Sequence, residues 1–326
     1  MKISILIPTC NRPQFLRECI ESAIRQTLPA DEILIGDDSS DDSSQEVVRQ
    51  IAAKCRSIKI SYFRHCPALG QSGNVSHLMK VSKGTHLTLI HDDDWLLDEA
   101  LEKLSKAFDV PDVIVSYGRQ ILASDSGVLN YDSIESINSS FWRSSADAGL
   151  QNDIRECALC GQFPNNGWLV ERNAALKIEY QDIKNEFGTG SDFRFSALFS
   201  EANPRGKAFL VDANTAVYRA SIKSIARTKN CSTAAMHAFP YVLSKYPEFN
   251  SHRVAYWLSW NAPVAVGQAI KNKSLKKAWR WFFTKWHLKS IFTLGAVKRT
   301  ILLGGLIVKV LGDAVMSRIP ASKYNR

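Results

Sequence analysis

Three consecutive carboxylates, Asp92, Asp93 and Asp94, follow the run 86–90, which is about half apolar and has the length of a strand. Adjacent carboxylates repel one another, so a folded protein keeps three of them together only where water or a cation neutralises their charge. Mg²⁺ and Mn²⁺ prefer oxygen ligands and are commonly held by one or two carboxylates plus phosphate oxygens of a substrate. The run therefore indicates either a cation site or a solvated acidic turn.

A second acidic pair favours the cation site. Asp37 and Asp38 end another apolar run, "EILIG", and Trp95 directly follows the three carboxylates. A calcium loop of the EF-hand type is excluded, because residues 91–99, "HDDDWLLDE", have neither its glycine nor its spacing.

The chain lacks the usual phosphate-binding loops. No GxGxxG follows the first apolar run and no GxxxxGK[ST] occurs anywhere. Carboxylates would repel a phosphate directly, but a cation between them and a diphosphate offsets the charge that develops on a departing diphosphate. A nucleotide diphosphate is a leaving group that fits this arrangement.

The first 120 residues alternate between strand and helix patterns. This order predicts an α/β fold with a mostly parallel sheet and helices on both faces, in which ligands bind beyond the carboxyl ends of the strands. Polar clusters at 9–12, 37–42 and 91–94 follow three of the expected strands and so converge on one edge. The expected strands are 3–8, 32–36, 58–64, 86–90 and 112–118, and the expected helices are 13–24 (capped by Asn11), 43–54, 75–81 and 98–108.

The later part of the chain is less regular. Residues 131–165 are rich in Ser, Asn and Asp and are expected to form loops over the site. Helical patterns return at 172–178 and 192–200. Cys157 and Cys160 are interpreted as thiols, because a zinc site needs a second pair or nearby histidines.

The basic charge is concentrated at the C-terminus. The chain has a net charge of +9, but residues 271–326 hold 13 Lys or Arg and one acid, so the preceding 270 residues are close to neutral. Five of the eight tryptophans lie between 257 and 286. Interleaved tryptophan and lysine are typical of a membrane interface, and 300–316 reads as a surface-lying or re-entrant helix because Lys309 and Asp313 interrupt its apolar pattern. A contact with an anionic membrane is therefore expected and nucleic-acid binding is not, since RNA-binding tails are poorer in Leu, Ile and Val.

Two domains follow from this asymmetry: 1–233, with a nucleotide-binding half (1–120) and an acceptor-binding half (121–233), and a helical, basic and aromatic region at 234–326. The N-terminus reads as a first buried strand and lacks the apolar core of a secretion signal. We expect a cytoplasmic protein, peripheral at the inner face of the cell membrane.

The stretches "SILIPTCNRPQFLRECIESAIRQTLPADEILIGDDSSDD" and "LGQSGN…KGTHLTLIHDDDWL" resemble the family 2 inverting glycosyltransferases of GT-A fold. The match covers about the first 100 residues, with the family's motifs in order. The resemblance implies a nucleotide-sugar donor, most simply UDP- or dTDP-linked. It also implies a divalent metal and, in envelope polysaccharide synthesis, a glycan or lipid-linked acceptor.

The resemblance also implies roles for individual residues. Pro8 and Thr9 would line the base pocket, and Asn11 and Arg12 would form its rim. Asp38 would accept a hydrogen bond from the imide N–H of a uracil- or thymine-type base.

The three carboxylates would form the D-x-D motif of the family. Asp92 and Asp93 would bind the nucleotide near the ribose, and Asp93 or Asp94 would bind the metal, since the run permits a shift of one residue. His91 stands where many relatives have another aspartate, and would either touch ribose or pack.

Inverting transfer also needs a base that takes the proton of the acceptor hydroxyl. The family's base is an acid at the head of a helix about 100 residues after the D-x-D, which implies Asp192, with Glu186 as the second candidate. Asp192 also suits a helix cap, and the two roles are compatible. Trp168 is a candidate for stacking on a sugar ring or for the core.

Two other functions remain open: a glycosyltransferase-like module that binds sugar nucleotides without catalysis, and a nucleotidyltransferase. The nucleotidyltransferase is disfavoured because it usually carries a G-G-x-G-T-R loop, which this chain lacks.

Overall fold

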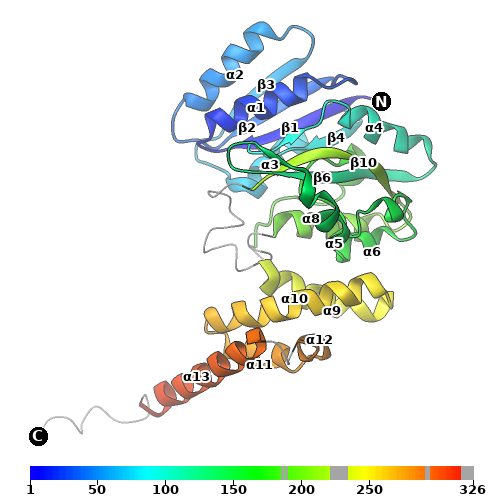
Figure 1. The fold of residues 1–326 in the computed structure, drawn as a ribbon. Helices are drawn as coiled ribbons and strands as arrows, with labels where there is room; N and C mark the ends of the chain where they lie inside the picture. The colour runs from blue at the N-terminus through cyan, green and yellow to red at the C-terminus, as the bar shows by residue number, and fades with distance from the viewer. Residues whose placement is uncertain (185–186, 188–189, 221–233, 291–293, 317–326) are drawn as a thin grey trace, which may run out of the picture. The chain divides into compact units, whose positions relative to one another are not determined.

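The computed structural model describes residues 1–184, 187, 190–220, 234–290 and 294–316 (Figure 1). These residues form two compact units, each described here by itself. The first unit comprises Met1–Glu186 and Ser191–Thr228, and the second comprises Phe187–Gly190 and Lys229–Arg326. The predicted boundary at 233/234 adjoins residues outside the described part, so it stays a prediction, as does the division at 120/121.

The first unit begins with the predicted alternation of strands and helices. Two of the helices are longer or shorter than predicted: the third begins at Gly70, and the fourth is split into α4 and a 3₁₀ turn. The elements of this half are β1 (Ile3–Thr9), α1 (Pro13–Ile24), β2 (Glu32–Asp37), α2 (Ser43–Lys54), β3 (Lys59–Arg64), α3 (Gly70–Val81), β4 (His86–Leu89), β5 (Trp95–Leu96), α4 (Ala100–Ser105), η1 (Lys106–Asp109) and β6 (Val113–Ala123).

The second half of this unit contains more strands than the sequence predicts. The expected helix at 172–178 is a single turn, and a long strand follows the expected helix at 192–200. The elements are β7 (Leu129–Asn130), η2 (Tyr131–Ser133), α5 (Ile134–Ser140), η3 (Ser145–Asp147), β8 (Gly149–Leu150), α6 (Ile154–Leu159), β9 (Leu169–Glu171), α7 (Arg172–Ala175), α8 (Ser191–Ala202) and β10 (Lys207–Arg219).

All of these strands join one sheet in the order β3-β2-β1-β4-β9-β6-β10-β5, with β7 paired to β6 and β8 to β10. Strands β1 to β4 are mutually parallel, as are β6 and β10, while β9 runs antiparallel to both β4 and β6. The carboxyl ends of β1, β2, β4, β6 and β10 therefore share one edge, where the loop before β9 also arrives. The sheet is mixed, since β9 separates two parallel blocks.

Both faces of the sheet are buried, as the apolar strands require. Along β1, Ile3, Ile5 and Ile7 pack into one core with residues of α1, α2 and α4, while Leu6 packs into the other core with residues of α3, α6 and α8. Alternate side chains of a strand point to opposite faces, so a continuous apolar run such as "ISILI" serves both layers. The strand ends are consequently held rigidly.

The second unit is helical, as predicted, and no helix among its described residues is long and apolar enough to cross a membrane. The large exposed apolar side chains among its described residues lie on or beside four helices: Tyr256, Trp260 and Val264 on α10, Trp279 on α11 with Phe283 just beyond its end, Leu288 at the end of α12, and Val297, Ile301 and Leu302 on α13. The side chains of Lys309 and Asp313 lie outside the described residues. The helices are α9 (Ala234–Phe249), α10 (His252–Lys271), α11 (Leu275–Phe282), α12 (Lys285–Leu288) and α13 (Leu294–Met316) (Figure 1).

Candidate active site

The three carboxylates lie at the carboxyl edge of the sheet, in the turn between β4 and β5. Thr9, the last residue of β1, donates its hydroxyl hydrogen to Oδ2 of Asp92 at 2.7 Å. Because β1 and β4 pair in parallel, their ends meet, and this bond closes the gap between them. Thr9 is 3% exposed, so its side chain contacts Asp92 and not solvent.

Arg12 is a counter-ion of this cluster. Its Nη1 lies 3.2 Å from Oδ1 of Asp92 and 2.9 Å from Oδ2 of Asp93, and its side chain is 24% exposed. Burial alone would lower the pKa of Arg12, but the charges of Asp92 and Asp93 raise it. The Arg12 guanidinium, at the start of α1, therefore supplies part of the positive charge that neutralises the three carboxylates.

A second arginine holds the turn from the other side. Arg219, at the end of β10, donates its backbone N–H to Oδ1 of Asp94 at 2.8 Å and its Nε–H to the carbonyl of Asp93, also at 2.8 Å. The Arg219 side chain is 3% exposed and forms an ion pair with Glu18. Its guanidinium carbon lies 4.8 Å from the ring centre of Phe15. Arg219 thus holds the backbone of Asp93 and the carboxylate of Asp94.

Asp94 is the most enclosed of the three carboxylates. It is 1% exposed, its Oδ1 accepts from Arg219, and its Oδ2 accepts from Nδ2 of Asn166 in the loop before β9. Burial, and then the charge of Asp93, raise the pKa of Asp94 well above its ordinary value. Burial also raises the pKa of Asp92 to about 6, although Arg12 lowers it.

These residues fit a hard divalent cation in their chemistry. The donors are carboxylate oxygens, and buried carboxylates with raised pKa values are those that gain most from added positive charge. Asp93 is the best placed, because its one recorded side-chain partner is the partly exposed Arg12, whereas both oxygens of Asp94 accept from the protein. Within the described residues no three His, Cys, Asp or Glu side chains converge on one point. The donor set therefore fits a cation that takes its remaining ligands from a substrate.

The acidic pair after β2 is held differently. Asp37 is fully buried and accepts from the hydroxyl of Tyr62 at 2.6 Å and from the backbone N–H of Ser39 at 2.8 Å. The Asp38 carboxylate is 5% exposed, and its Oδ1 lies 2.9 Å from Nδ1 of His65. Asp37 thus shapes the end of the strand, whereas the Asp38 carboxylate is held by His65 and by the backbone N–H of Leu69.

Asn11 does not cap α1 as predicted. The N-cap is Arg12, and Asn11 takes a positive φ of 55°. Its Oδ1 accepts from the backbone N–H of Ser40 at 2.9 Å, and its own N–H donates to the Ser39 hydroxyl at 2.7 Å. Asn11 therefore ties the loop after β1 to the loop after β2. Pro8 precedes Thr9 in β1 and pairs with Gly36 of β2.

Asp192 lies near the acidic cluster, in the first turn of α8. Its Oδ1 accepts from the buried hydroxyl of Tyr180 at 2.6 Å and lies 3.9 Å from Nε2 of His91. That His91 nitrogen is buried and has no hydrogen-bond partner within the described residues. Burial raises the pKa of Tyr180 well above its ordinary value, so Tyr180 stays a donor and Asp192 an acceptor. Glu186 lies outside the described residues.

Two other candidates belong to the core. Trp168 is 5% exposed and stacks on Phe195, with ring centres 5.5 Å apart, so it packs rather than facing a sugar. Cys157 and Cys160 are 1% and 2% exposed, and no metal-binding cluster includes them in the described part of the chain. The interpretation as buried thiols agrees with this position.

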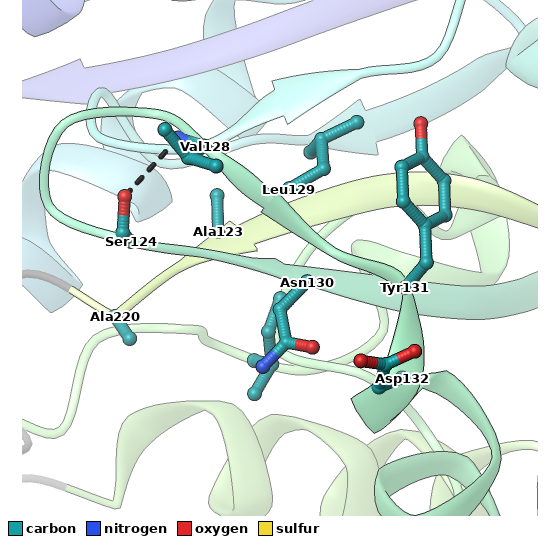
Figure 2. A pocket seen from close by; sticks show the side chains of 9 residues that line it. Ala123, Ser124, Val128, Leu129, Asn130, Tyr131, Asp132 and Ala220 are labelled. Carbon is teal, nitrogen blue, oxygen red and sulfur yellow. Dashed lines mark hydrogen bonds between the residues drawn. The ribbon is translucent and has the colours of Figure 1, made fainter.

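An open cavity of about 630 Å³ lies at the same edge, between the β6–β7 hairpin and Ala220. Figure 2 shows Leu129 and Tyr131 extending to one side of this segment and Asn130 and Asp132 to the other. Ala220 directly follows Arg219, so the cavity begins one residue from the backbone N–H that donates to Asp94. Its mixed apolar and polar lining suits a small polar ligand.

The sequence model of the family described as glycosyl transferase family 2 matches residues 4–166, which include β1 to β6 and the three carboxylates. The chain belongs to this family. The resemblance seen in the sequence is confirmed.

The chain is also similar to known glycosyltransferases in sequence and in structure. The chain is 33% identical over 103 residues to the poly(ribitol-phosphate) beta-glucosyltransferase of Bacillus spizizenii, over 31% of this chain and only 16% of that relative's length. It is similar in structure to Staphylococcus aureus TarS 1–349 in complex with UDP (TM-score 0.55, 14% identity, 84% of this chain and 72% of that one). It is similar as well to the Pyrobaculum calidifontis mannosyltransferase PcManGT in complex with GDP-Man and Mn²⁺ (TM-score 0.55, 14% identity, 96% and 87%). The predicted GT-A fold with a C-terminal helical region is confirmed.

Several residues of the site were not identified from the sequence: Arg219, Asn166, Tyr180 and His65. Each reaches its aspartate from another segment, 125 residues away in the case of Arg219 and Asp94. No spacing rule links such positions, and Arg219 reads as an ordinary polar end to a strand. Asn166 alone lies in a recognisable pattern: "PNNG" predicts a polar turn before an apolar strand, where side chains of a site are often found.

The raised pKa of Asp92 predicts a pH dependence of stability. Its folded-state pKa is about 6 and its unfolded value is about 3.9, so the folded protein binds the extra proton between these values. Relative to Asp92→Asn, the wild type should lose about 1–3 kcal/mol of unfolding free energy as the pH rises from 4 to 6. Urea unfolding in EDTA measures this, and Asp98→Asn, with a side chain 60% exposed, is the control. A flat difference for Asp92→Asn would contradict the assignment.

Proposed function

We propose that this protein is an inverting, metal-dependent glycosyltransferase. It transfers a sugar from a nucleotide-diphosphate sugar, UDP- or dTDP-linked, to a hydroxyl of a glycan or lipid-linked oligosaccharide in cell-envelope polysaccharide synthesis. The observation that carries the proposal is the meeting of Asp92–Asp94 with His91 and Asp192 at the carboxyl edge of the sheet. A relative that glucosylates poly(ribitol phosphate) and a structural neighbour bound to UDP support the class and the donor.

The donor side rests on Asp38 and the carboxylate cluster. Asp38 presents an acceptor to an imide N–H, and Asp92, held by Thr9, faces the ribose. Asp93 and Asp94 would hold Mg²⁺ or Mn²⁺, and the cation would neutralise charge on the diphosphate. The Mn²⁺ complex of the archaeal mannosyltransferase supports this metal class.

The acceptor side rests on Asp192. Its carboxylate takes the proton of the acceptor hydroxyl while that oxygen bonds to the anomeric carbon and the bond from this carbon to the diphosphate oxygen breaks. Within the described residues, Asp192 contacts the Tyr180 hydroxyl and His91 through Oδ1. Its side chain is 32% exposed, so Oδ2 can receive the proton. Tyr180 holds the carboxylate in place.

We further propose that the second unit rests on an anionic membrane surface at the inner face of the cell membrane. Trp260 is 70% exposed, and Tyr256 and Val264 lie one turn to either side of it on α10. On the next helix, Trp279 and Phe283 are exposed among the lysines and arginines of 276–289. Aromatic rings at headgroup level with flanking cations match such a surface, and would bring a lipid-linked acceptor to the enzyme.

Calorimetric titration tests the donor side. One of UDP, dTDP and GDP should bind in Mn²⁺ and not in EDTA. Asp93→Asn should weaken its binding about tenfold or more, because the cation loses a carboxylate, and Asp38→Ala should do the same through the base. Asp98→Asn is the matched control and should bind as the wild type does.

The alternative function gives a different outcome. A catalytically inactive module would bind the sugar nucleotide with metal and yet transfer no sugar to any acceptor. Absence of binding by all three nucleotides would show that the aspartates are not a working donor site, and would contradict the proposal.

Replacement of the base tests catalysis separately. Asp192→Asn should lower kcat about 10²- to 10⁴-fold, because the acceptor hydroxyl loses the carboxylate that takes its proton, and should leave nucleotide affinity unchanged. Steady-state kinetics with membrane-extracted acceptor measure this. Glu201→Gln, at the far end of the same helix, is the control. If Asp192→Asn retained wild-type kcat, the base would lie elsewhere.

Vesicle flotation tests the membrane surface. The protein should float with phosphatidylglycerol vesicles and much less with phosphatidylcholine vesicles, because the cations of the second unit need anionic lipid. Trp260→Ser combined with Trp279→Ser should abolish flotation by removing the aromatic anchors. Tyr131→Ser, which removes a ring 64% exposed in the first unit, should not change it. Equal flotation of all variants would refute this surface.

A further inference from the structure

Behind Asp38 lie two histidines that the proposed chemistry does not use. We propose that His65 and His77 form a positioning pair that keeps Asp38 an acceptor only, and so makes the nucleotide site select a base with a ring N–H over one with a bare ring nitrogen. The inference rests on the proposed function, in which Asp38 contacts the base.

The three side chains form a continuous chain of hydrogen bonds. Nδ1 of His65 lies 2.9 Å from Oδ1 of Asp38, and Nε2 of His65 lies 3.1 Å from Nδ1 of His77 on α3. The two imidazole rings meet edge to face, with centres 4.9 Å apart. His65 and Asp38 are 8% and 5% exposed in their side chains, so water does not supply these contacts.

The backbone is shaped to admit this chain. Gly36, two residues before Asp38, lies where a Cβ would be 3.2 Å from Cε1 of His65 and 1.9 Å from Oδ1 of Asn74. A Cβ at this position would collide with the Asn74 side chain and crowd the His65 imidazole. The N–H of Leu69, in the loop before α3, donates to the same Oδ1 of Asp38 at 3.1 Å.

The direction of each hydrogen bond follows from the first. Because the Asp38 carboxylate can only accept, neutral His65 must carry its proton on Nδ1, which leaves Nε2 an acceptor. His77 must then donate from its Nδ1. Burial, the largest cause, lowers the pKa of His77, which favours this neutral state. Every donor in the chain therefore points toward Asp38.

This polarity decides what Asp38 can recognise. Within the described residues, the hydrogen bonds to its carboxylate, from His65 and from the N–H of Leu69, both reach Oδ1, so Oδ2 can accept from a ligand. Uracil and thymine present a ring N–H to such an acceptor, whereas the corresponding nitrogen of cytosine is itself an acceptor and would be repelled. Without His65, the Asp38 carboxylate would lose the side-chain donor that holds Oδ1, and with it the orientation in which Oδ2 meets a ring N–H.

The test is the ratio of UDP to CDP affinity, measured by calorimetry in Mn²⁺. The wild type should prefer UDP, and His65→Leu should lower the ratio about tenfold. His65→Asn should restore it to within about threefold, because the amide nitrogen of asparagine occupies the place of Nδ1 and can still donate to Asp38. His77→Phe should give an intermediate ratio, since it removes the group that fixes the tautomer of His65.

His86→Leu is the matched control, because His86 is a half-buried histidine of the same unit at the start of β4, away from the carboxyl edge. It should leave the ratio unchanged. If His65→Leu is folded, as judged by its melting temperature, and keeps the wild-type ratio, or if His65→Asn is as impaired as His65→Leu, the positioning role is wrong. A wild type that binds neither nucleotide would instead overturn the proposed function on which this role depends.

Discussion

Three adjacent carboxylates buried at the end of one strand are the constraint around which the first unit is organised. Their charge must be balanced at short range, since burial multiplies the cost of repulsion. Arg12 supplies a positive charge from the start of α1, and Arg219 at the end of β10 donates its backbone N–H to the Asp94 carboxylate and its Nε–H to the Asp93 carbonyl. The long strand β10 must return beside β6 for Arg219 to make these contacts. The sheet order therefore helps to hold the acidic turn.

The sequence predicts the half of the unit in which neighbours along the chain are neighbours in space. Strands β1 to β4 alternate with amphipathic helices, and their parallel pairing brings the three polar clusters to one edge. Strand β9 breaks this regularity by inserting antiparallel between β4 and β6. Only three residues long, β9 carries no periodic pattern, and its place depends on partners more than 50 residues away. The long-range members of the site, Asn166 and Arg219, were missed for the same reason.

Asn11 shows how a local preference yields to a tertiary requirement. Asparagine before a proline-containing first turn is a good helix cap, and local chemistry alone favours that role. Asparagine also tolerates positive φ better than most residues, and here it uses that tolerance to turn its side chain toward Ser40. The helix α1 begins without a side-chain cap, and the Asn11 hydrogen bonds instead join the loop after β1 to the loop after β2. Functional edges are where such departures are expected.

The two acidic groups at this edge are balanced by different means, and the difference matches what each must bind. Asp92 and Asp93 face the positive charge of Arg12, which the proposed divalent cation would supplement. Asp38 faces His65 and a backbone N–H, which donate hydrogen bonds without requiring a formal charge. A site that distinguishes bases by hydrogen-bond polarity benefits from a constant acceptor. In the proposed function, these separate environments would let the charge beside the diphosphate change during transfer while the contact to the base stays the same.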